Sequence, residues 1–111
     1  MISLFDLATV QARWLSVRQA AIAENVANAA TPGFQARDVK PFDAVLGDIA
    51  REGEVATLLA PDATPWTVRV SGNTVSLEEE MVRAGAVQRA YALNTGIVAA
   101  FHRMTLAATR G

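Results

Sequence analysis

Few residues of this chain of 111 amino acids have side chains suited to chemistry, and their spacing favours structure over catalysis. His102 is the only histidine, and its neighbours at helical spacing are apolar, so it lacks a second metal ligand or an orienting carboxylate. The adjacent carboxylates of Glu78, Glu79 and Glu80 point in different directions on a helix, which suits a first helical turn better than a cation site. We therefore expect no catalytic, cofactor-binding or metal-binding residue.

The composition excludes several other classes of function. The net charge is -1, so no basic field favours nucleic acid, and no cysteine is present to form a disulfide or a thiolate metal site. No apolar run reaches the roughly 18–20 residues of a membrane span, and the first residues lack the basic leader of a cleaved signal peptide. Alanine supplies much of the 51% hydrophobic content, which favours helices with a thin core that partners complete.

The first 30 residues predict one long helix. Ser3 is a good N-cap, with Asp6 three residues later and a hydrophobic staple from Ile2 to Leu7. Apolar residues then follow a 3-4-3-4 spacing, which places them on one stripe of coiled-coil periodicity. The helix-interface residues predicted here are Leu7, Val10, Trp14, Val17 and Ala21.

Pro32 disfavours helical angles at the residue before it and so ends this helix. The stretch Thr31-Pro32-Gly33-Phe34 suits a type II turn, with proline in the second position and glycine supplying a positive φ in the third. Asn25 and Asn28 lie on the last turns of the helix. Two roles are open for them: binding a neighbouring molecule, or capping the helix locally.

The middle of the chain, residues 31–75, gives weaker signals. Pro41 is suited to open a short helix that ends by Gly53. Residues 66–70 alternate apolar and polar side chains, which is typical of a strand. This strand either pairs with residues 55–60 as a hairpin or belongs to an extended arm.

A second long helix is predicted over residues 76–109. Ser76 and Glu79 form a capping box after Asn73, and Arg83 lies four residues beyond Glu79, where the two can form an ion pair. The interface residues predicted on this helix are Val87, Tyr91, Ile97, Phe101 and Met104. We therefore predict an all-α fold in one domain, residues 1–111, whose two terminal helices pack as a coiled-coil-like pair around an irregular or partly β middle.

Residues 23–34, AENVANAATPGF, resemble the N-terminal signature of the flagellar rod, hook and hook-associated proteins. The signature residues are Asn25, Asn28, Thr31, Pro32, Gly33 and Phe34. Residues 71–81, SGNTVSLEEEM, resemble the segment that opens the C-terminal helix in proximal-rod members of that family, through Asn73, Ser76, Glu79 and Met81.

The resemblance implies a structural subunit of the proximal rod in the flagellar basal body, on the periplasmic side of the inner membrane. Its partners would be further copies of itself, other rod proteins, the MS ring, the adapter protein between ring and rod, and the flagellar type III export apparatus, which exports such subunits without a cleaved signal. The middle segment is too short for the outer domains of distal-rod and hook proteins, which favours the proximal rod. The alternative is a cytoplasmic helical hairpin that binds another amphipathic helix.

Overall fold

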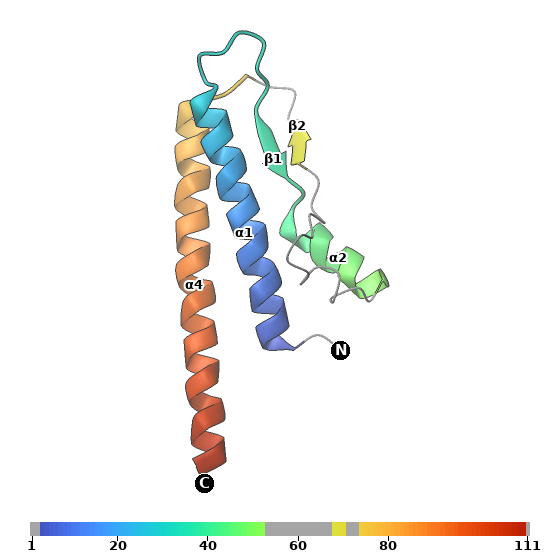
Figure 1. Ribbon diagram of the computed structural model, residues 1–111, viewed down its shortest axis with the longest axis vertical. Coiled ribbons are helices and arrows are strands. Elements are labelled where there is room, and N and C mark those ends of the chain that lie inside the picture. Colours follow the sequence, from blue (N-terminus) through green and yellow to red (C-terminus); the bar gives the residue numbers. More distant parts are fainter. Residues whose placement is uncertain (1–2, 53–67, 71–73, 111) are drawn as a thin grey trace.

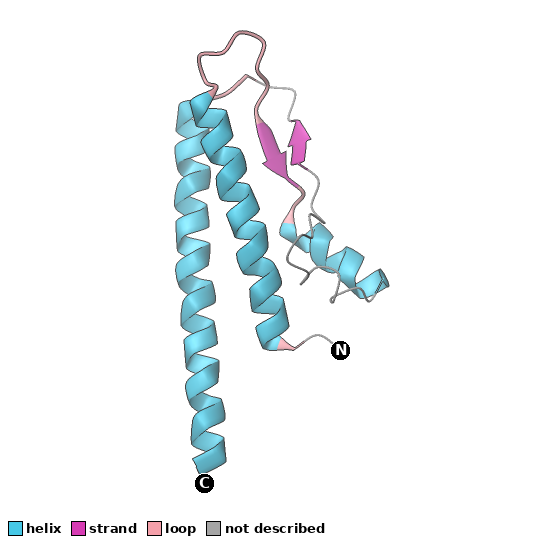
Figure 2. Cartoon of the chain, viewed as in Figure 1, coloured by secondary structure: helices cyan, strands magenta, loops and turns pink. Residues whose placement is uncertain are grey.

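Two long helices lie side by side in the computed structural model, with a short helix and two short strands against one of them (Figures 1 and 2). The structure describes residues 3–52, 68–70 and 74–110. In chain order the elements are α1 (Leu4–Ala27), β1 (Arg37–Val39), α2 (Phe42–Glu52), β2 (Val68–Val70) and α4 (Leu77–Arg110). The all-α class predicted from the sequence is confirmed, and the strands account for the partly β middle.

The cap predicted for the first helix is present at the start of α1. The Ser3 hydroxyl accepts a hydrogen bond from the Asp6 backbone N–H at 3.1 Å, which satisfies one of the free donors of the first turn. The predicted staple involves Ile2, which lies outside the described residues. The helix ends at Ala27 rather than at residue 30, because the chain leaves helical geometry at the cap residue Asn28.

The helix α4 is much longer than its partner. At about 1.5 Å per residue, the 34 residues of α4 span roughly 51 Å and the 24 residues of α1 roughly 36 Å. The C-terminal part of α4 therefore extends past the start of α1, and residues 101–110 are all exposed (Figure 1). The molecule measures 62 × 29 × 21 Å, and its radius of gyration is 16.6 Å. A compact chain of this length would have a radius of gyration of about 13 Å.

The core lies mainly where α1 meets β1 and α2, and it is small. Its fully or nearly buried members are Val10, Trp14, Leu15, Ile22, Val39, Val45, Ile49 and Val87. Only the last of these comes from α4, so α4 contributes one buried apolar side chain to this cluster. The short helix begins after Pro41, as predicted, and the Pro41 carbonyl accepts hydrogen bonds from the N–H groups of Ala44 and Val45.

The strand predicted near residues 66–70 is present as β2, and its partner is β1. The two strands are antiparallel, with Arg37 opposite Val70 and Val39 opposite Val68. The strand β1 has only three residues, too few for an alternating pattern to predict it. The segment 55–60, considered above as a hairpin partner, lies outside the described residues.

Candidate assembly site

The residues 31–34 form the turn that their types predict. The Phe34 N–H donates to the Thr31 carbonyl at 3.2 Å, and Gly33 has a φ of 76°. A Cβ added at Gly33 would meet no atom within 4 Å, so only the backbone angle demands glycine there. The turn reverses the chain beyond the end of α1 and directs β1 back along that helix (Figure 1).

Asn28 caps the end of α1 and makes its hydrogen bonds locally. Its backbone N–H donates to the carbonyl of Glu24, and its side-chain Nδ2 donates to the same oxygen at 2.9 Å. Its Oδ1 accepts from the Thr31 hydroxyl at 3.2 Å. Of the two roles open for Asn28, its contacts are those of the local cap.

Asn25 makes neither of the contacts considered for it, because it is fully buried and binds a strand. Its Nδ2 donates to the Arg37 carbonyl at 2.7 Å, and its Oδ1 accepts from the Arg37 N–H at 2.9 Å. One amide therefore satisfies both backbone groups of the first residue of β1. This pairing could not be predicted from the sequence, because Asn25 and Arg37 are 12 residues apart and come together only through the turn at residues 31–34.

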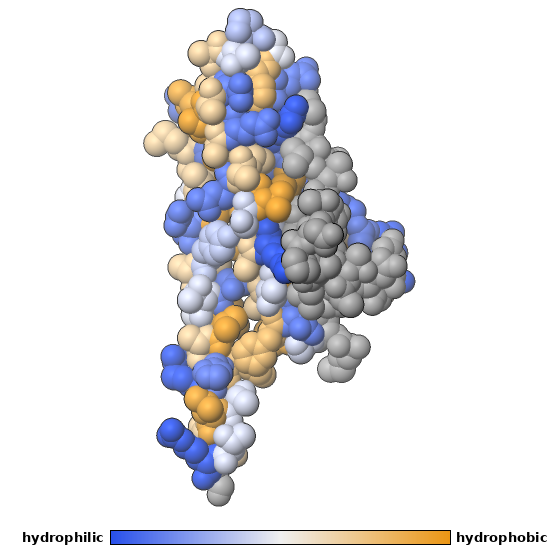
Figure 3. Space-filling view, in the orientation of Figure 1, coloured by the Kyte–Doolittle hydropathy of each residue, from blue (hydrophilic) through white to orange (hydrophobic). Residues whose placement is uncertain are grey.

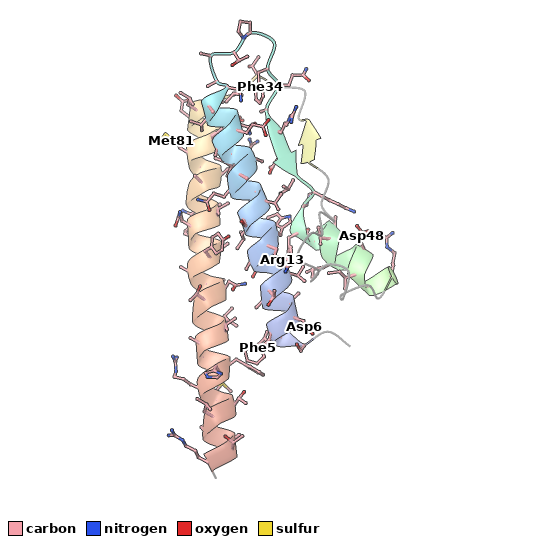
Figure 4. The ribbon with its side chains drawn as sticks, viewed as in Figure 1. Phe5, Asp6, Arg13, Phe34, Asp48 and Met81 are labelled. Carbon is pink, nitrogen blue, oxygen red and sulfur yellow. The ribbon has the colours of Figure 1, made fainter. Side chains whose placement is uncertain are left out.

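Four polar and aromatic contacts join α1 to α4. Asn94 donates through Nδ2 to the Ala8 carbonyl at 3.0 Å and to the Gln11 side-chain oxygen at 2.9 Å. The Tyr91 hydroxyl donates to the Ala12 carbonyl at 3.2 Å. Near the start of α1, the ring of Phe5 (Figure 4) meets the ring of Phe101 edge to face, with the ring centroids 5.2 Å apart. Small residues on α1 allow α4 to approach its backbone, so side chains of α4 bond to carbonyl groups.

The predicted interface residues differ in how deeply the single chain buries them. Val10, Trp14 and Ala21 are buried, whereas Leu7 and Val17 are half-buried. On α4, Val87 is buried and Tyr91 is half-buried, but Phe101, Ile97 and Met104 are 38%, 45% and 66% exposed.

Trp14 faces β1 and α2 rather than α4. Its Nε1 donates to the Lys40 carbonyl at 2.7 Å, its ring lies 5.4 Å from the Phe42 ring, and Arg18 lies over it at 5.5 Å. A single stripe cannot describe α1, because this helix has neighbours on two sides. Leu15 and Ile22, which the stripe omits, are also buried.

A charged cluster ties the start of α4 to β1 and α1. Arg83 lies 2.5 Å from Glu80, 3.9 Å from Glu79 and 3.9 Å from Asp38. Asp38 in turn lies 3.4 Å from Arg18. Glu80 lies in the first turn of α4, as its position in the sequence predicts, but its side chain is only 1% exposed. Its burial follows from the packing of the first turn of α4 against the rest of the chain, which periodicity alone does not show.

Of the residues predicted to mark the start of the C-terminal helix, Ser76 caps the helix and Met81 faces solvent. The Ser76 hydroxyl accepts from the Glu79 N–H at 3.4 Å, a long contact. Met81 is 73% exposed and points away from α1 (Figure 4). Asn73 lies outside the described residues.

A second charged group fixes the short helix. Asp48 of α2 forms ion pairs with Lys40 and Arg51. The hydrogen bond from Lys40 is the main cause that holds the pKa of the Asp48 carboxyl below its usual value, with a further contribution from Arg51.

Possible metal ligands are not brought together among the described residues. No three histidine, cysteine or acidic side chains among them cluster as metal ligands would, and His102 is exposed on α4. In the part of the chain that the structure describes, no helix is both long enough and apolar enough to cross a bilayer.

Large apolar side chains are exposed on the described surface, and most of them belong to α4. On the face drawn in Figure 3, apolar residues occur along the length of the helical pair. The large exposed ones of α4 are Leu77, Met81, Val82, Leu93, Ile97, Phe101, Met104 and Leu106. Exposed side chains of this size on one helix are typical of a surface that other helices cover. The arrangement is thus suited to helix–helix association.

Comparisons with known proteins agree with this arrangement. The family model described as "Flagella basal body rod protein" matches residues 15–35, which include the end of α1 and the turn. The chain is 42% identical over 122 aligned residues to the flagellar basal body rod protein FlgB of Agrobacterium fabrum (strain C58). The alignment covers 95% of this chain and 91% of that protein. An exposed apolar helix, a turn that carries the family signature and this similarity together place the chain in the FlgB family of flagellar basal body rod proteins.

Proposed function

We propose that this chain forms the base of the rod, where it joins the rod to the MS ring through an adapter protein and transmits torque by helix packing. The observation that carries the proposal is the length of α4 that the chain leaves uncovered: residues 101–110 are all exposed and include Met104 and Leu106. An apolar helix end of this kind is stabilised when helices of neighbouring subunits bury it.

The helix-interface residues would then serve two different contacts. Val10, Ala21 and Val87 hold the subunit together, since they are already buried. Ile97, Phe101 and Met104 would meet neighbouring subunits. Contacts between different surfaces of successive copies do not close on themselves and so build a helical tube. Many such contacts would share a twisting load along the rod.

The partners proposed for the chain are copies of itself, other rod proteins, the MS ring with its adapter, and the type III export apparatus. The short stretch between α1 and α4, residues 28–76, supports a place in the proximal rod. The proposed location is the periplasmic side of the inner membrane, with export that needs no cleaved signal. We propose no direct contact with nucleic acid and no insertion into the membrane.

Deletion of the gene from its source bacterium tests this function. Purified basal bodies would be examined by electron microscopy, and swimming would be measured with and without the intact gene on a plasmid. We expect membrane rings without rod, hook or filament, and recovery of all three when the gene is restored. Normal flagella in the deletion strain would contradict the proposal, and a helical hairpin that binds a cytoplasmic partner would then be the better interpretation.

A further inference from the structure

A groove runs between α1 and α4 on one side of the helical pair. It has a volume of about 510 Å³ and is open to solvent. Most of its lining is small: Ala8, Thr9 and Ala12 from α1, and Thr95, Val98 and Ala99 from α4. Phe5 and His102 lie toward the same end of the two helices. The groove continues the α1–α4 interface, since Asn94 and Phe5 belong to both.

The groove is suited to an apolar occupant rather than a polar ligand. Its lining includes no carboxylate, lysine or arginine. The Thr9 hydroxyl already donates to the Phe5 carbonyl at 2.9 Å, and the Asn94 amide donates to two acceptors on α1. Since these donors are engaged within the chain, binding would come mainly from the burial of apolar surface.

The same chain also carries a surface of large, exposed apolar side chains, here called the α4 ridge. It consists of Val82, Leu93, Ile97 and Met104, which are between 45% and 69% exposed. At 3.6 residues per turn, these four side chains lie within about 60° of one another around the helix axis, and the centre of that arc lies roughly 170° from Thr95 and roughly 130° from Ala99. The ridge and the groove therefore lie on nearly opposite faces of α4.

We propose that the α4 ridge of one copy of this chain packs into the α1–α4 groove of the next copy. Large side chains on the ridge would meet small side chains in the groove, which is the pairing that lets one helix sit closely between two others. The groove lining includes no carboxylate, lysine or arginine. On the ridge face the exposed Arg89 lies between Val82 and Leu93, and its long side chain allows the guanidinium to stay in water at the edge of the contact. The contact joins two different surfaces and is therefore heterologous, so it repeats from copy to copy instead of closing a symmetric pair. The inference rests on the proposed rod function and identifies the partner of these residues as a second copy.

Cysteine cross-linking tests the contact, because the natural chain has no cysteine to compete. Two copies of the gene would be expressed together in the deletion strain, one with Ala99→Cys in the groove and one with Ile97→Cys on the ridge. Isolated basal bodies would be oxidised and blotted for this chain. We expect a band at twice the 11.8 kDa chain mass in the mixed sample. Each variant expressed alone should give no such band.

The matched control pairs Ala99→Cys with Ala50→Cys, since Ala50 is exposed on α2, outside both the groove and the ridge. A dimer band as strong in this control, or in either single variant, would overturn the inference. The absence of a dimer band from the mixed sample would also overturn the inference, because another protein would then have to cover the groove. The pair Thr95→Cys and Leu93→Cys repeats the test in case one substitution prevents assembly. Swimming restored by the intact gene without any mixed dimer would leave the rod function standing and remove only this contact.

Discussion

Asn25 connects the family signature to the packing of the chain, because its buried amide holds the backbone of β1 at Arg37. Replacing Asn25 with alanine should lower the free energy of unfolding by about 2–4 kcal/mol, since two hydrogen bonds are lost and buried backbone groups are left unpaired. Urea unfolding followed by circular dichroism measures this change.

The control for Asn25 is Asn28→Ala, which removes a side chain of the same type from the exposed cap. We expect a cost of about 1 kcal/mol there, because water can replace the lost partners. Equal losses at the two positions would show that the Asn25 clamp contributes no more than the cap does.

A branched side chain at Gly33 should destabilise the fold because of the positive φ at this residue, not because of a clash with neighbouring atoms. Gly33→Val should destabilise the fold by about 1–2 kcal/mol, because a φ of 76° is unfavourable for a residue with a Cβ. Gly47→Ala is the matched control: its added Cβ also meets no atom within 4 Å, but Gly47 lies inside α2 without a positive φ. That control should be neutral or stabilising by up to about 1 kcal/mol. A Gly33→Val chain as stable as the natural one would contradict the turn described here.

The ion pairs of Asp48 should make part of the folding stability depend on pH. Its folded pKa is lowered, so the stability from its ion pairs is present above the unfolded pKa, about 3.9, and is lost as the pH falls through the lower folded value. An NMR titration of the Asp48 carboxyl carbon should show a midpoint below that of an ordinary aspartate. Lys40→Gln should raise this midpoint, because it removes the main cause of the shift. A midpoint unchanged by Lys40→Gln would refute the assignment.

At the scale of the elements, α1 is the helix around which the others pack, because it contacts α4 on one side and β1 and α2 on the other. Leu15→Ala should cost about 2–5 kcal/mol, since this side chain is 1% exposed within the core. Leu93→Ala removes the same atoms from an exposed position on α4 and should cost under about 0.5 kcal/mol. Comparable losses in urea unfolding would mean that α4 buries Leu93 in the free chain.

The two long helices and the turn between α1 and β1 could be predicted from sequence because their signals are local. Ser3, Pro32 and Gly33 act through neighbours a few residues away, and apolar spacing fixes the extent of α1 and α4. The packing partners could not be predicted in this way. Trp14 belongs to the same stripe as Val10, but nothing in the spacing shows that β1 and α2 cover it. The burial of Glu80 likewise depends on tertiary contacts that a helical pattern does not contain.

At the scale of the whole molecule, folding and assembly should depend on different residues. Met104→Asp should change the free energy of unfolding by less than about 0.5 kcal/mol, because Met104 is 66% exposed, yet it should abolish swimming. Arg103→Asp places the same acid at the neighbouring exposed position and should leave swimming intact. Normal motility with Met104→Asp would argue against burial of this part of α4 in the rod.

The unequal lengths of α1 and α4 give the subunit two unlike ends. One end is the turn at residues 31–34, next to the start of α4, and the other is a single helix without its partner. A stack of subunits that all point the same way therefore has a direction, with helix tips presented at one terminus and turns at the other. A newly arriving subunit would meet a different surface at each terminus, so the two termini of such a stack would add subunits at different rates.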